Sequence, residues 1–60
     1  MTAQEFKETR ERLGQTQQGL AGVLGVTVRA VQYYEAGTRK VPGPVAALLK
    51  LLTLEVSENG

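Results

Sequence analysis

Threonine and glycine residues divide this sequence into segments that are each long enough for only two or three helical turns. Thr2 and Glu5 form the capping-box pattern Thr-x-x-Glu, in which each side chain binds the backbone of the other residue, and the pattern predicts a helix start. Thr16 and Thr27 are placed to cap two further helices, because a threonine oxygen can accept a bond from an unpaired N–H of the first turn. Glycines suited to the left-handed residue that ends a helix follow at Gly14, Gly25 and Gly37.

Apolar residues recur at helical spacing inside each segment, and again after a loop at 38–43. Pro44 suits the first turn of the helix that follows this loop, because its missing N–H would have no helical partner there. The expected helices cover residues 3–13, 17–24, 28–36 and 44–54. No region favours strands, so the sequence predicts an all-α domain over residues 1–54, a compact bundle of four short helices with a fifth left open. Residues 55–60 are expected to form a frayed tail.

The composition leaves one apolar core as the main source of stability. A chain of 60 residues buries only about 60% of its unfolded surface, so its stability is expected to be marginal. The sequence contains no Cys and no His, which excludes disulfides and ordinary Cys/His zinc sites, and we expect no metal and no cofactor. Neither an apolar run of about 18 residues nor a signal-peptide pattern is present, which favours a cytoplasmic protein. The net charge of +1 is weak evidence for a polyanionic partner.

The most informative stretch is residues 17–36, in which two short helices meet at the turn Gly25-Val26-Thr27. Glycine permits the positive φ that such a turn needs, and Ala21 is small enough for the two helices to approach closely. Apolar residues that would fill the angle between these helices are Leu20, Leu24, Val26, Val31 and Tyr34. This joint spacing predicts a helix-turn-helix motif.

These residues resemble the phage repressor and Cro-like family, also called the xenobiotic-response-element type, over about residues 6–52. The resemblance rests on Gln15-Thr16-Gln17, Leu20-Ala21, Leu24-Gly25-Val26-Thr27, Val31 and Glu35-Ala36-Gly37. It implies a lambda-repressor-like bundle that binds double-stranded DNA as a dimer on a palindromic operator. The loop 41–44 is richer in proline than is usual in the family. Gly19 and Gly22 are unexpected inside the second helix, where each costs about 1 kcal/mol relative to Ala.

The third helix is expected to present an outward face to the bases of DNA. With Val31 and Tyr34 directed inward, the outward residues at i, i+3 and i+4 are Arg29, Gln32 and Tyr33, and Val28 lies on the exposed first turn. Arginine can bind guanine through two hydrogen bonds, glutamine can bind adenine in the same way, and valine can contact a thymine methyl. Tyr33 is expected to pack on a base edge or to reach a phosphate.

Phosphate contacts are expected at the starts of the second and third helices and in the basic loop after the third. The residues assigned to this role are Gln17, Thr27, Thr38, Arg39 and Lys40. The family resemblance further implies a structural ion pair between Arg10 and Glu35, which would join the first helix to the third.

Three other interpretations stay open at this point. The outward residues of the third helix can be an ordinary solvated face, and the loop charges can serve solubility alone. An enzyme is not favoured, because the chain has no His, Cys or Asp and its first glutamates repeat along an exposed helix with bases between them. The strongest rival is a protein-interaction module, an antitoxin-like or coactivator-like subunit that keeps the fold without binding DNA. Leu51, Leu54 and Val56 are a possible surface for such a partner or for a homodimer, and no small-molecule site is evident.

Overall fold

Four helices joined by three short connections account for most of the chain. The computed structural model describes the backbone of residues 1–59 and the side chains of residues 1–54. The helices are α1 (Ala3–Arg12), α2 (Gln17–Leu24), α3 (Val28–Ala36) and α4 (Gly43–Asn59). No strand occurs within residues 1–59. The predicted all-α bundle of four helices is therefore confirmed.

The first three helices begin in the same way, at a threonine with extended backbone. The hydroxyl oxygens of Thr2, Thr16 and Thr27 accept bonds from the backbone N–H three residues later, at 3.1, 2.9 and 3.1 Å. Glu5 completes the capping box by accepting the Thr2 N–H at 2.9 Å. Since each cap satisfies a donor that has no helical partner, each is worth about 1 kcal/mol.

α2 and α3 also end in the same way, at glycines with left-handed backbone. Gly25 has φ 72° and Gly37 has φ 77°. The backward bonds that such a turn allows are present, from the Val26 N–H to the Ala21 carbonyl and from the Thr38 N–H to the Tyr33 carbonyl, both at 3.0 Å. Each turn therefore pairs a helix-end carbonyl while it redirects the chain.

α4 is longer than the sequence analysis predicts. It begins at Gly43 and continues past Leu54 to Asn59, where a frayed tail is expected from the sequence. The physical reason is that residues 55–59 contain neither glycine nor proline, so nothing in them stops a helix that is already formed. The side chain of Val56, which the sequence assigns to a possible partner surface, lies outside the described residues.

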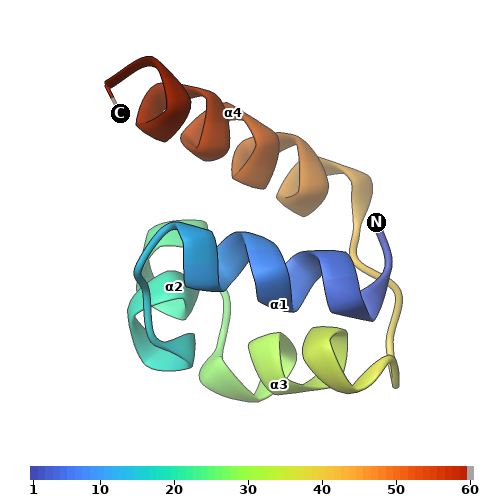
Figure 1. The fold of residues 1–60 in the computed structure, drawn as a ribbon. Coiled ribbons are helices and arrows are strands. Elements are labelled where there is room, and N and C mark those ends of the chain that lie inside the picture. Colours follow the sequence, from blue (N-terminus) through green and yellow to red (C-terminus); the bar gives the residue numbers. More distant parts are fainter. Residues whose placement is uncertain (60) are drawn as a thin grey trace.

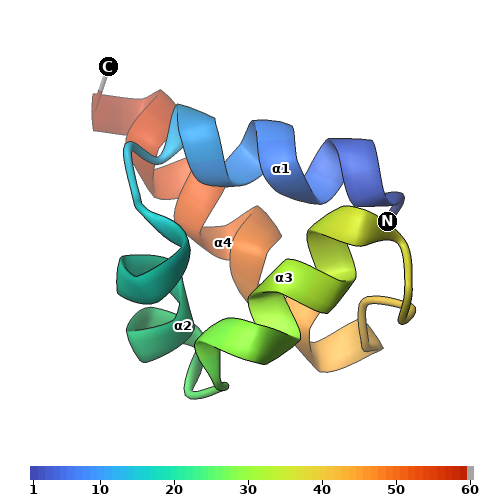
Figure 2. The same cartoon turned by 90° about the horizontal axis from the view of Figure 1, so that it is seen from below.

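Every helix contributes to a single core. Its buried members are Phe6, Leu20, Ala21, Val31, Tyr34 and Leu49. The rings of Phe6 and Tyr34 pack with centroids 5.5 Å apart at an interplanar angle of 57°, a tilted arrangement that aromatic pairs favour. Figure 1 shows α1 between α4 on one side and α3 on the other, and Figure 2 shows α3 in front with α4 behind it. Leu49 is completely buried and is the residue by which α4 joins this core.

The two glycines inside α2 have different surroundings. A Cβ on Gly19 would lie 2.6 Å from the Gln15 side-chain oxygen and 3.2 Å from the Thr16 hydroxyl oxygen. Gly19 therefore leaves room for the cap at the start of α2. A Cβ on Gly22 would meet nothing within 4 Å, and no contact in the structure explains a glycine there.

Gly22→Ala and Gly25→Ala are expected to change the stability in opposite directions. Gly22 is exposed and its φ is not positive, so alanine should raise the free energy of unfolding by about 0.5–1 kcal/mol. At Gly25 the positive φ opposes a Cβ, and alanine should lower it by about 1–2 kcal/mol. Urea denaturation followed by circular dichroism measures both, and a stabilising G25A would contradict the argument from φ.

Candidate nucleic-acid interface

The outer face of α3 presents three side chains to solvent. Val28, Arg29 and Gln32 are exposed, whereas Val31 and Tyr34, on the opposite side of the helix, are buried in the core. The turn after Gly25 and the packing of α2 on α3 hold this helix at the edge of the domain (Figure 2). A short helix held in this way can enter the major groove of DNA with its first turn toward the base edges.

Tyr33 differs from its neighbours on this face, because it is half-buried. The guanidinium carbon of Arg39 lies over its ring, 4.6 Å from the ring centroid. A cation over an aromatic face is attracted by the negative charge density of that face. The sequence gives no signal for this contact, because the turn at Gly37 separates the two residues and their spacing does not follow the helical period.

The other predicted phosphate contacts lie at the two ends of α3. Thr27 is exposed and caps the start of the helix, with its hydroxyl bound to the Ala30 N–H. Thr38, Arg39 and Lys40 are exposed in the loop that follows its end. The structure thus places polar and basic groups on both sides of the exposed residues of α3.

The side chain of Gln17 does not project freely into solvent, as the sequence prediction of a phosphate ligand requires. Its side-chain amide donates to Glu35 Oε1 at 3.1 Å, and the residue is half-buried. The start of α2 is therefore attached to α3 through this side chain. Sequence periodicity gives no signal for such a bond between residues 18 positions apart.

The ion pair that the family resemblance implies is present between Arg10 and Glu35. Arg10 Nε lies 2.5 Å from Glu35 Oε2, and Arg10 Nη2 lies 3.2 Å from Glu35 Oε1. The remaining terminal nitrogen of Arg10 donates to the Gln15 carbonyl at 3.0 Å. Both side chains are mostly buried, at 15% and 7% exposure. The hydrogen bonds to Glu35 raise the pKa of Arg10 above its ordinary value, and the pair joins α1 to α3.

The charges of the chain are segregated along it, although they nearly cancel in total. Residues 12–54 contain five basic residues and one acid, which is the paired Glu35. Five of the six acids are placed before residue 12 or after residue 54. The basic residues of the middle region are Arg12, Arg29, Arg39, Lys40 and Lys50. Of these, Arg29, Arg39 and Lys40 lie on α3 or in the loop that follows it, and the single acid there is the paired Glu35, so α3 and its loop carry net positive charge, which favours a polyanionic partner.

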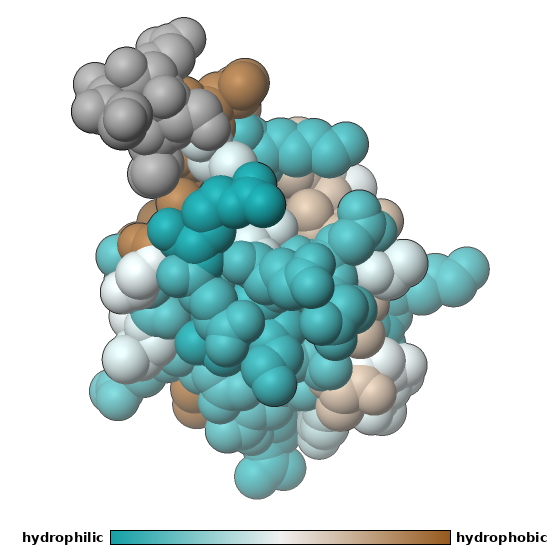
Figure 3. All heavy atoms as spheres, viewed as in Figure 1, coloured by the Kyte–Doolittle hydropathy of each residue, from teal (hydrophilic) through white to brown (hydrophobic). Residues whose placement is uncertain are grey.

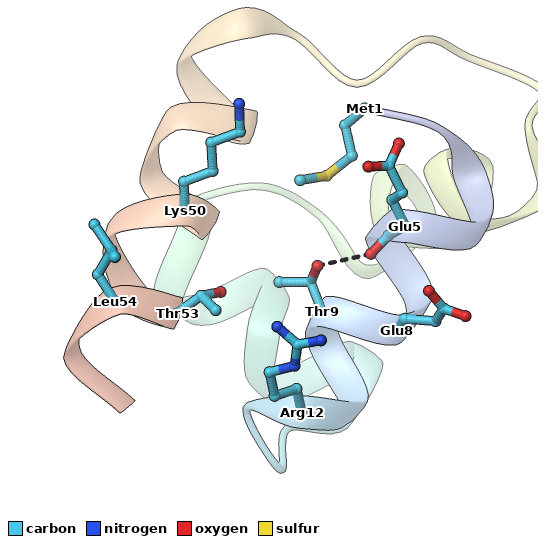
Figure 4. Close-up of a pocket in the computed structure, with 8 residues that line it drawn as sticks. All are labelled: Met1, Glu5, Glu8, Thr9, Arg12, Lys50, Thr53 and Leu54. Carbon is cyan, nitrogen blue, oxygen red and sulfur yellow. Dashed lines mark hydrogen bonds between the residues drawn. The ribbon is translucent and has the colours of Figure 1, made fainter. Parts of the chain in front are cut away.

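A concave region lies between α1 and α4, on the side of the domain away from α3 (Figure 4). It encloses about 490 Å³ and is lined by Met1, Glu5, Glu8, Thr9, Arg12, Lys50, Thr53 and Leu54. Its polar groups are partly engaged within the fold, since the Thr9 hydroxyl donates to the Glu5 carbonyl at 2.7 Å. The backbone N–H of Thr2 lowers the pKa of Glu5 through its hydrogen bond to that carboxylate. Such a group stays ionised and is poorly suited to act as a general acid.

Within the described part of the chain, no three or more potential metal ligands lie together. No helix in the described part of the chain is long and apolar enough to cross a membrane.

Comparison with known families identifies the class of this domain. The family model described as a helix-turn-helix domain matches residues 3–58, almost the whole chain, and the protein belongs to this family. The match confirms the predicted helix-turn-helix domain, and membership implies DNA as the partner. No curated protein and no solved structure matches the chain.

Arg10→Ala and Glu35→Ala are each expected to lower the free energy of unfolding by about 3–5 kcal/mol, because each leaves a mostly buried charge without its partner. The double variant should lose less than the sum of the two single losses, since it leaves no charge behind. Thermal denaturation measures these effects. Glu8→Ala, which removes an exposed acid from α1, is the control and should change the stability by less than about 0.5 kcal/mol. Single variants as stable as E8A would show that the pair contributes nothing.

Proposed function

We propose that this protein is a sequence-specific, double-stranded-DNA-binding transcription regulator that inserts α3 into the major groove. The observation that carries the proposal is the exposed face of α3, where Val28, Arg29 and Gln32 stand free of the core at one edge of the domain. Their chemistry matches base edges, because arginine, glutamine and an apolar methyl group read guanine, adenine and thymine. Such a regulator acts without catalysis, in the bacterial or phage-infected cytoplasm where its DNA lies.

The basic loop after α3 supplies affinity in this proposal. In it, Arg39 and Lys40 bind phosphates of the DNA. Thr27 and Thr38 contact the DNA backbone at the two ends of α3. Such contacts set the register of α3 on the duplex and carry no direct sequence information. Gln17 contributes by fixing the start of α2, whose free N–H groups suit a phosphate, and its side chain stays bound to Glu35.

Two copies are proposed to bind one palindromic operator, because a helix of nine residues contacts only a few base pairs. Recognition helices of two such copies lie about 34 Å apart on one face of the duplex. Leu51 and Leu54 are 60% and 58% exposed on α4 and offer the apolar contact between copies. α4 and α3 lie at opposite sides of the domain in Figure 1, so a contact between copies through Leu51 and Leu54 leaves the exposed face of α3 open.

The same leucines favour the second candidate, a protein-interaction module. Figure 3 shows hydrophobic surface toward the C-terminal part of α4, whereas the surface over α1 is mostly hydrophilic. A module that bound a partner only through Leu51 and Leu54 would have little sensitivity to salt. DNA binding releases counterions at each neutralised phosphate, so its affinity falls steeply as salt rises. A salt series on duplex DNA separates the two functions.

Arg29→Ala is expected to weaken binding to the preferred duplex by about 1–3 kcal/mol and to relax the preference at one position of each half-site. The preferred duplex is obtained by selection from a random pool, and affinities are measured by fluorescence anisotropy. Lys40→Ala is the matched control, because it removes a charge beside α3 and should weaken all sequences equally. An equal loss on all sequences for R29A would make Arg29 a phosphate ligand.

Inserting about five base pairs between the half-sites is expected to abolish cooperative binding, because the second copy then faces the opposite side of the duplex. Leu51→Ser combined with Leu54→Ser should also remove the cooperativity while the affinity for an isolated half-site is kept. Sedimentation of the protein on one operator counts the chains directly. A tight complex with one chain per operator would contradict the proposal of two copies.

A further inference from the structure

Tyr33 is the one residue of the predicted base-reading set that is not fully exposed and whose side chain already contacts another residue of the protein. Val28, Arg29 and Gln32 are exposed, but Tyr33 is half-buried and carries the Arg39 guanidinium carbon 4.6 Å from its ring centroid. The covered ring face is not open to a base edge. The interaction that the structure shows for the Tyr33 ring is therefore the one with Arg39.

The turn after α3 brings Arg39 to this ring. Gly37, with φ 77°, turns the chain back on the helix. The Tyr33 carbonyl then accepts the Thr38 N–H at 3.0 Å and the Arg39 N–H at 3.5 Å. Both the backbone and the side chain of Arg39 are thus held against Tyr33, one through hydrogen bonding and the other through the ring face.

The contact with the ring leaves the arginine able to bind an anion. A ring attracts the guanidinium through its charge distribution and takes up none of its N–H donors in conventional hydrogen bonds. Within residues 1–54 no carboxylate lies within ion-pair distance of Arg39, and its side chain makes no hydrogen bond there. An arginine held in this way loses less conformational freedom when it binds a phosphate.

We propose that Tyr33 is a positioning residue, which holds Arg39 at the end of α3 so that its guanidinium binds a backbone phosphate beside the bases that α3 contacts. Tyr33 reads no base itself. The inference rests on the proposed function, because it needs DNA as the partner. Lys40, the next residue, is exposed and has no aromatic contact in the described structure, so it provides a comparison cation in the same loop.

The experiment measures the affinity of Tyr33→Phe, Tyr33→Leu, Arg39→Ala and the double variant Y33L/R39A for the preferred duplex and for random duplex, each over a salt series. Y33F keeps the ring and should bind like the wild type. Y33L should weaken binding about two- to fivefold on both duplexes, the loss expected for an exposed cation–π contact. R39A should reduce the salt slope by about one. The double variant should be no weaker than R39A alone, because the ring acts only through the arginine.

Two controls keep the result tied to positioning. Thermal denaturation shows which variants are folded. Y33L combined with Lys40→Ala should give losses of DNA affinity that add, because the ring does not hold Lys40. Losses from Y33L and R39A that simply add would overturn the inference while DNA binding stands. A change in base preference in both Y33F and Y33L would overturn it too, because Tyr33 would then read a base. A wild-type domain that does not bind duplex in a salt-dependent way would reject the proposed function and this inference together.

Discussion

The carboxylate of Glu35 is the meeting point of three segments of the chain. It accepts two bonds from Arg10 on α1 and one from Gln17 at the start of α2, while its own backbone belongs to α3. Arg10 extends the network to the Gln15 carbonyl in the loop between α1 and α2. In so small a core, the angle between α2 and α3 depends on few apolar side chains. The network fixes that angle from outside the core, and so sets the direction in which α3 faces solvent.

Local sequence rules predicted the parts of the fold that depend on neighbouring residues. Thr16, Thr27, Gly25 and Gly37 mark helix ends through backbone chemistry that acts over three or four positions, and the structure places α2 and α3 between them. The predicted end of α4, at about Leu54, was wrong, because the helix continues where no residue stops it. Residues 55–59 contain no glycine or proline and therefore continue the helix. Their mostly polar composition, taken by itself, predicts a frayed tail.

The contacts that sequence reasoning missed are those made across space. The Gln17–Glu35 bond and the Tyr33–Arg39 stack join residues on different elements, and both take a side chain out of the role that its helical position suggests. Periodicity correctly placed Val28, Arg29 and Gln32 on the exposed face, because exposure follows from the helical repeat once the buried side is known. It could not show which outward side chain the next loop would cover.

The exposed residues of α3 take no part in what holds the domain together. The caps use threonine hydroxyls and the backbone, the ion pair uses Arg10 and Glu35, and α4 is held by the buried Leu49. Val28, Arg29 and Gln32 project beyond all of these. Stability and the proposed recognition thus depend on separate side chains, so we expect substitutions at the three outward positions to leave the scaffold intact. A domain organised in this way is suited to diversification, since new binding preferences can arise in a lineage without loss of the folded state.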